Sequence, residues 1–192
     1  MAAGDMIKNR FQEFTDEQTG TRVVRLTEPD HVSHHMYFYN RMTTADGSHL
    51  LYCAEIGGER QLYLAVQLTE GEGLDDYGGL IAADDKHIFY QQEQAIWKLS
   101  LETLERECVY RIPEGWNGGN WGMSEDNRFL AIVETRRDSL PEKKKGANWD
   151  FFAITCKAKP HCRIVYCDLQ TGSFHTVLED DCRGSGYHHV LP

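Results

Sequence analysis

The chain has 192 residues, of which 41% are hydrophobic and 11% aromatic, a composition typical of one folded domain with its own core. Its formal net charge is −10 at pH 7. This acidic balance argues against non-specific nucleic-acid binding, which needs a basic surface, and an acidic ligand would need a local cationic site.

The first ten residues, MAAGDMIKNR, contain no apolar stretch of the kind found in a signal peptide. No apolar run approaches the ~20 residues of a membrane-spanning helix. We therefore expect a cytoplasmic protein with reduced cysteines and no membrane partner. Cys156, Cys162 and Cys167 lie near His161, but none of these cysteines forms a CxxC pair, so no metal is assigned to this chain.

In chain order, the first predicted element is a strand over residues 21–27, in EQTGTRVVRLTE. This stretch resembles LQTGSFHTVLED at residues 169–180, and in both a glycine-containing turn leads into an apolar strand. We interpret each strand as the outermost strand of a sheet. Because no blade precedes residues 21–27, this strand is expected to be an orphan, of the kind that completes the last blade of a closed propeller.

A short motif then recurs three times, as TADGSHLLY, AADDKHIFY and SEDNRFLAI. Each copy has an aspartate in third place (Asp46, Asp84 and Asp126), followed by a turn residue and an apolar strand. Asp-Gly and Asp-Asn pairs suit tight turns because they tolerate positive φ. The interval of about 40 residues, with several short strands in each, is typical of propeller blades.

These repeats predict an all-β fold, a partial β-propeller of about three four-stranded blades in a single domain over residues 1–192. The blades are expected over residues 36–69, 77–113 and 121–179, with a fourth begun at residues 186–192.

Two of the predicted blades depart from the regular pattern. In the first, the stretch that should form the outer turn is about seven residues too short, so this blade is expected to be distorted or three-stranded. The third carries an insertion over residues 136–161, where we expect a short helix or an ordered loop.

Several stretches resemble the oligogalacturonate lyases, namely TGTRVVRLT, HHMYFYNRMTTADGSHLLY, YGGLIAADDKHIFY, GNWGMSEDNRFLAIVE and NWDFFAITCKAKPHCRIVYCDLQTG. The similarity runs in order over nearly the whole chain. The aspartate motif alone is shared by many TolB-like propellers, whereas the HxxYFY stretch and the insertion are more specific to the family.

The resemblance implies a seven-bladed propeller that splits oligogalacturonides, the anionic fragments of pectin, by β-elimination, usually with manganese. In the family, the base and the metal-binding histidines lie in the C-terminal half. This chain looks like the N-terminal part, so none of its residues is assigned a catalytic or metal-ligand role. A non-catalytic sugar- or protein-binding module remains open, as does an inactive product that associates through open propeller edges.

Candidate substrate contacts lie where the chain leads into the innermost strands, and they are His34, Tyr37, Tyr77, Asn120 and His188. Imidazoles and aromatic faces suit a sugar acid. Tyr37 and Tyr39 would share one strand face, where packing between blades is the competing interpretation. His188 and His189 would point to opposite faces, so only one could face the channel. The carboxylates Glu179 and Asp181 are interpreted as a solvated turn.

Overall fold

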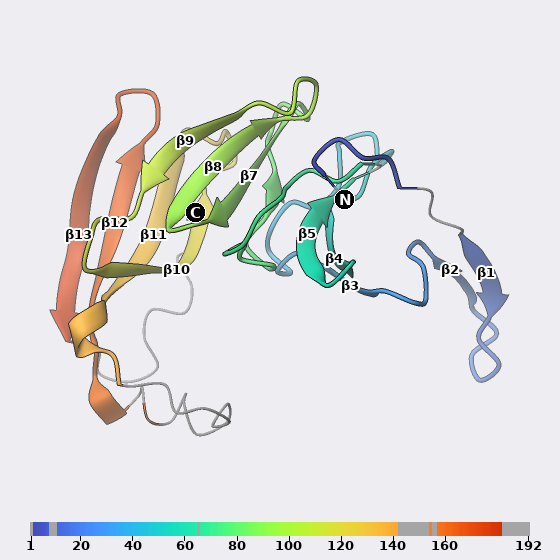
Figure 1. Ribbon diagram of the computed structural model, residues 1–192, viewed down its shortest axis with the longest axis horizontal. Helices are drawn as coiled ribbons and strands as arrows, with labels where there is room; N and C mark the ends of the chain where they lie inside the picture. Colours follow the sequence, from blue (N-terminus) through green and yellow to red (C-terminus); the bar gives the residue numbers. More distant parts are fainter. Residues whose placement is uncertain (1, 8–10, 65, 142–153, 155–156, 182–192) are drawn as a thin grey trace. The chain divides into compact units, whose positions relative to one another are not determined.

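The computed structural model describes residues 2–7, 11–64, 66–141, 154 and 157–181, which form an all-β partial propeller with its strands in four sheets (Figure 1). The chain divides into two compact units. The first holds residues 1–93 and 98–106, and the second holds residues 94–97 and 107–192. None of the helices in the described ranges is long and apolar enough to span a membrane.

The first sheet is a hairpin of two strands, β1 (Gln12–Thr15) and β2 (Arg22–Arg25), which pair antiparallel. The strand predicted at residues 21–27 is therefore present, and it belongs to none of the three larger sheets, in agreement with a strand that has no blade; its partner β1 was not predicted. Its partner β1 has the sequence QEFT and is exposed throughout, so no apolar pattern marked it as a strand. The backbone N–H of Gly20 donates to Asp16 O at 2.9 Å and closes the turn between the strands.

The second sheet has three strands in the order β3 (Val32–His35), β4 (Tyr52–Ile56) and β5 (Glu59–Tyr63). This confirms the prediction of a three-stranded first blade. Beyond β5, Met6 forms an isolated bridge with Val66, and the N–H of Gly4 donates to Gln67 O at 2.8 Å. The N-terminal segment therefore pairs with the chain at the place where the outer hairpin is too short to form.

The third sheet has four strands in the order β6 (Leu80–Ile81), β7 (His87–Gln92), β8 (Ala95–Ser100) and β9 (Arg106–Arg111). A two-residue turn joins β7 to β8, and Glu93 and Gln94 in it have φ values of 53° and 59°. Positive φ at both positions is the geometry of the tight hairpin turns that match strand twist.

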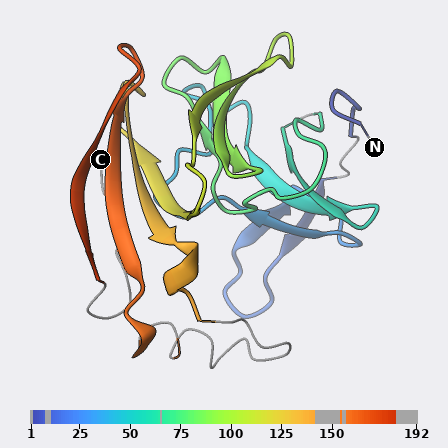
Figure 2. The same cartoon turned by 60° about the vertical axis from the view of Figure 1, so that its left-hand side comes forward.

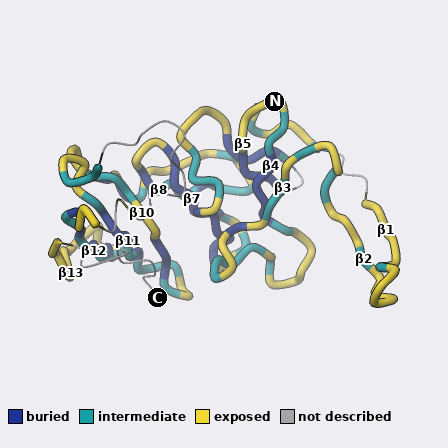
Figure 3. The backbone as a smooth tube through the Cα atoms, turned by 90° about the horizontal axis from the view of Figure 1, so that it is seen from below, coloured by how far each residue is buried: buried dark blue, intermediate teal, exposed yellow. Residues whose placement is uncertain are grey.

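The fourth sheet has four strands in the order β10 (Trp116–Met123), β11 (Phe129–Arg136), β12 (His161–Asp168) and β13 (Ser173–Asp181), which Figure 2 shows side by side. One face of the sheet is buried, where Leu130 pairs with Cys167 and Ile132 with Val165. The outer strand β13 is exposed along its whole length (Figure 3).

The predicted insertion begins inside β11 and continues into a short 3₁₀ helix, η1 (Arg137–Ser139). The rest of the insertion falls largely on residues 142–153 and 155–156, which lie outside the described residues.

The recurring aspartate turns form as the sequence predicts. In each, the residue after the aspartate has positive φ: 69° at Gly47, 56° at Asp85 and 58° at Asn127. In each, the aspartate Oδ1 accepts a backbone N–H from two residues further on: Ser48 at 2.9 Å, Lys86 at 2.8 Å and Arg128 at 3.0 Å. The motif is therefore one structural unit used three times.

Candidate functional site

In the first unit, His34 and Tyr77 form a stacked aromatic pair. His34 lies on β3, and its ring centroid is 4.3 Å from that of Tyr77 at an interplanar angle of 19°. Tyr77 comes from the segment before β6, where the Asp75 carboxylate accepts the Tyr77 N–H at 3.1 Å. The structure thus brings two of the predicted substrate contacts together.

A carboxylate and a guanidinium complete this cluster. Asp76 Oδ2 lies 3.6 Å from His34 Nε2 and 2.5 Å from Arg60 Nη1. His34 Nε2 is buried and has no hydrogen-bond partner among the described residues. A buried polar atom without a partner is costly, so a ligand hydroxyl at this nitrogen would offset that cost.

Two titratable groups beside the cluster are shifted toward their neutral forms. Burial, helped by the nearby Asp76 charge, raises the pKa of Asp75 above its usual value. Burial also raises the pKa of the Cys53 thiol, which pairs with His34 across β3 and β4, to about 12. A thiol that stays protonated at neutral pH is a poor metal ligand or nucleophile.

Tyr37 reaches the same cluster through its backbone. Its N–H donates to Tyr77 O at 3.1 Å, and its exposed ring contacts Phe38 and Tyr39 at centroid distances of 4.7 Å and 4.9 Å. The prediction that Tyr37 and Tyr39 share a strand face is wrong. The strand β3 ends at His35, and the Asn40 N–H donates to Tyr37 O at 2.8 Å, which closes a turn there.

Of the two remaining predicted contacts, one lies in the second unit and the other outside the described residues. Asn120 is an exposed residue of β10 in the second unit, within the register shift between Gly118 and Trp121. Trp121 itself is 4% exposed, in agreement with a packing role. His188 lies outside the described residues.

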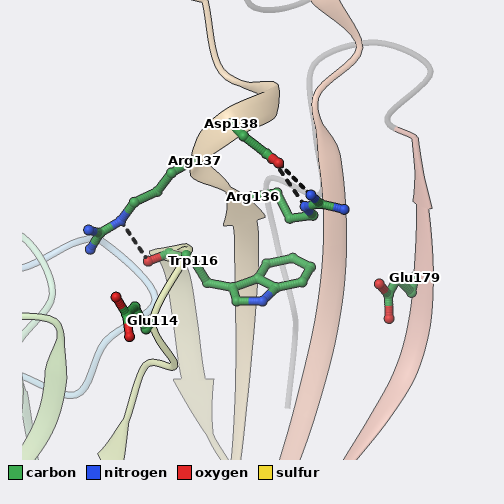
Figure 4. Close-up of a pocket in the computed structure, with 7 residues that line it drawn as sticks. Glu114, Trp116, Arg136, Arg137, Asp138 and Glu179 are labelled. Carbon is green, nitrogen blue, oxygen red and sulfur yellow. Dashed lines mark hydrogen bonds and ion pairs between the residues drawn. The ribbon is translucent and has the colours of Figure 1, made fainter.

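A pocket of about 430 Å³ opens in the second unit, where β10 begins and β11 and β13 end (Figure 4). It is lined by Glu114, Gly115, Trp116, Arg136, Arg137, Asp138 and Glu179. Figure 4 shows the Trp116 indole between Glu114 on one side and Glu179 on the other. None of these residues was predicted from the sequence as a contact.

The Trp116 indole is held by a buried polar network. Arg163 Cζ lies 4.0 Å from the ring centroid, and the same guanidinium contacts Glu134 Oε2 at 2.7 Å. Tyr110 Oη donates to Glu134 Oε1 at 2.6 Å, and Glu134 is fully buried. Burial and this hydrogen bond raise the pKa of Tyr110, so the phenol stays protonated and donates to the carboxylate.

His161 anchors the wall of the pocket that comes from β13. Its ring nitrogens lie 2.9 Å from Glu179 Oε1 and 3.0 Å from Asp181 Oδ1. Hydrogen bonds to Glu179 first and Asp181 second raise the pKa of His161 above its usual value of 6.5. These carboxylates are exposed, as predicted, but the interpretation of their segment as a turn is wrong. Both lie on β13, and the strand register places Asp181 opposite His161.

Neither the His34 cluster nor the Trp116 pocket contains enough metal-ligating side chains, among the described residues, to hold a metal ion. Within residues 2–7, 11–64, 66–141, 154 and 157–181, no group of three or more His, Cys, Asp or Glu side chains could hold a metal ion. Structural and catalytic transition-metal sites need three or four protein ligands. The described residues therefore do not fit a complete manganese site.

Repeated aspartate turns and sheets of three and four strands define this chain as a partial propeller. The family model described as oligogalacturonate lyase matches residues 1–188. The oligogalacturonide lyase of Pectobacterium atrosepticum is 34% identical over 190 residues, which cover 94% of this chain and 48% of that protein. The chain belongs to the oligogalacturonate lyase family, and it spans about half the length of the curated relatives it matches.

Solved structures agree with this assignment. The oligogalacturonate lyase of Vibrio parahaemolyticus superimposes with a TM-score of 0.85 at 35% identity, covering 94% of this chain and 50% of that chain. An oligogalacturonate lyase in complex with manganese gives a TM-score of 0.88 at 35% identity, covering 95% of this chain and 50% of that one. A putative TolB from Agrobacterium tumefaciens, with a TM-score of 0.54 at 15% identity, covers 88% of this chain and 61% of its own and shows the shared propeller fold alone.

Proposed function

We propose that this chain is the N-terminal portion of an oligogalacturonate lyase and that it contributes substrate contacts rather than the reacting groups. The observation that carries the proposal is the family match over residues 1–188, together with about 50% coverage of related lyases. The substrate class would be oligogalacturonides, which are short anionic sugar chains.

The proposed reaction is a β-elimination. A base removes the proton from C5 of a galacturonate residue, next to its carboxylate, and the electron pair forms the C4–C5 double bond as the oxygen on C4 leaves. A divalent cation such as manganese, or an arginine, would neutralise the carboxylate and make the C5 proton more acidic. Because the described residues do not form a three-ligand metal site, no step of this chemistry is assigned to them.

The role proposed for this chain is carried by the His34 cluster. The stacked rings of His34 and Tyr77 offer an aromatic face to a sugar ring, and His34 Nε2 offers a polar atom without a hydrogen-bond partner among the described residues. Arg60 supplies a cation beside the cluster, and Asp76 Oδ2 lies 2.5 Å from its Nη1. The cluster can thus orient a hydroxyl-bearing ring while the reacting groups come from elsewhere.

Calorimetric titration of the chain with trigalacturonate tests this role. We expect binding that His34→Ala weakens by roughly tenfold, since one hydrogen bond and one ring contact are lost. His35→Ala is the matched control, because the neighbouring strand position points to the opposite face and should leave the affinity unchanged. Equal affinities of the wild type and the His34→Ala variant would contradict the assignment.

Turnover is followed separately by ultraviolet absorbance of the unsaturated product, with digalacturonate and Mn²⁺. We expect none from these 192 residues alone. Measured turnover would show that the reacting groups lie on this chain. Binding of a protein partner without any sugar affinity would instead favour an interaction module.

A further inference from the structure

We propose that the pocket beside Trp116 is a second carbohydrate site and that it takes a neutral pyranose ring rather than a sugar acid. The pocket lies wholly in the second unit, and its assignment goes beyond the role proposed for the His34 cluster. A volume of about 430 Å³ falls in the range of small-molecule sites and accommodates one or two sugar rings.

The aromatic residue that lines the site, Trp116, is held in place by its neighbours. Arg163 lies over the Trp116 ring at 4.0 Å, and its position is set by the fully buried Glu134. The His161 ring, 6.0 Å from the indole, restrains it further. An indole fixed in this way presents its apolar surface to a ligand with little loss of side-chain entropy on binding.

Most of the charges that line the pocket are paired. Arg136 forms a two-point ion pair with Asp138, through Nε to Oδ1 at 3.1 Å and through Nη2 to Oδ2. Glu179 shares His161 with Asp181: the two ring nitrogens both face carboxylates, an arrangement that only the imidazolium satisfies.

Two lining charges remain after these pairs. Arg137 uses its Nε–H on Trp116 O and Asn117 Oδ1, at 3.1 Å and 2.8 Å, so within the described chain its Nη groups stay available as donors. Glu114 has no ion-pair partner in the described ranges and offers acceptor oxygens. One donor and one acceptor group of opposite charge suit the hydroxyls of a neutral sugar.

A sugar acid fits this balance less well. If its carboxylate bound Arg137, it would be repelled by the Glu114 carboxylate, which lines the same pocket. The net charge of −10 on the chain also disfavours an anionic ligand. The neutral ring needs no charge partner, and its hydroxyls can accept from Arg137 and donate to Glu114.

The test uses methyl α-D-galactopyranoside and its C6 acid, a pair that differs only in the charged group. Titrations of the 192-residue chain are followed by the NMR signal of the Trp116 indole N–H, assigned with the Trp116→Phe variant. We expect the neutral sugar to shift this signal with a dissociation constant in the millimolar range, and the acid to bind several-fold more weakly. Because this signal reports on Trp116 alone, the test stays valid even if the His34 cluster binds no sugar.

Two variants sharpen the result. Trp116→Ala removes the reporting indole, so its binding is followed by the NMR signals of the sugar instead. The variant should bind the neutral sugar roughly tenfold more weakly than the wild-type chain, with retention of the fold checked by circular dichroism. Glu114→Gln, on an exposed side chain, removes the repelling charge and should reduce the preference of the site for the neutral sugar over the acid. No shift of the Trp116 signal by the neutral sugar, or tighter binding of the acid by the wild-type chain, would overturn the proposal.

Discussion

The hairpins β1–β2 and β12–β13 have the same turn but very different surroundings. In one, Asp16 Oδ1 accepts the Gln18 N–H at 3.1 Å; in the other, Asp168 Oδ1 accepts the Gln170 N–H at 3.0 Å. The glycine that completes each turn has a φ of 70° at Gly20 and 68° at Gly172. The turn therefore depends on local sequence, as the similarity of EQTG and LQTG indicates.

The surroundings decide what each hairpin contributes. The strand β12 also pairs with β11, and its residues Val165 and Cys167 are buried. The hairpin β1–β2 is a sheet of only two strands among the described residues, and its Phe14 and Val24 are 47% and 41% exposed. An isolated two-stranded hairpin is marginally stable in water. Turn chemistry thus specifies the hairpin, and the inner strands stabilise it.

The largest expected difference between the two regions concerns their ion pairs. Glu134→Ala leaves Arg163 and the Tyr110 hydroxyl without their buried partner and should lower the free energy of unfolding by about 3–5 kcal/mol. Glu13→Ala removes the exposed pair with Arg22 on β1–β2 and should have little effect. Chemical denaturation of both variants measures the contrast. A similar, small decrease in the free energy of unfolding of both variants would contradict the proposed stabilising role of Glu134.

A smaller contrast is expected at the turn glycines. At positive φ an alanine side chain is strained, so Gly172→Ala should cost roughly 1 kcal/mol in the unfolding of the second unit. Gly20→Ala has the same local strain but should leave the cooperative transition unchanged, because β1–β2 pairs with no other strand among the described residues. Thermal melts measure this contrast, and equal decreases in the melting temperature of the two variants would contradict it.

The smallest expected effect is the pH dependence of the β13 end. The pKa of His161 is raised in the folded chain. Its ion pairs therefore stabilise the folded state fully below about pH 6.5, and this stabilisation is lost as the pH rises through the folded pKa. Hydrogen exchange of the Glu179–Asp181 amides should therefore accelerate, beyond the intrinsic rate, above that pKa. His161→Gln should abolish this extra pH dependence, and its persistence in the variant would show that another group is responsible.

Much of the fold was predictable because the aspartate turns are local. Each needs only an Asp, a residue that tolerates positive φ and a following strand, and all three occur within a few residues of sequence. The three-stranded first blade followed from a length that cannot hold a hairpin. The strand β1 was missed because QEFT is short, polar and exposed.

The candidate sites were predictable only in part. His34 and Tyr77 were found because the sequence pattern places both where the chain leads into an inner strand. Tyr37 was misplaced because its segment turns after β3 instead of extending. The Trp116 pocket gave no sequence signal. Its indole depends on Arg163 and its wall on Glu179, and both positions are set by strand register over distances that local pattern does not encode.

Native-state hydrogen exchange on the 192-residue chain tests most directly the central claim, that the same hairpin is stable only where inner strands support it. The account predicts strong protection for the paired amides of β12 and almost none for those of β1 and β2, although both hairpins have the same turn. Equal protection of the two hairpins would contradict it.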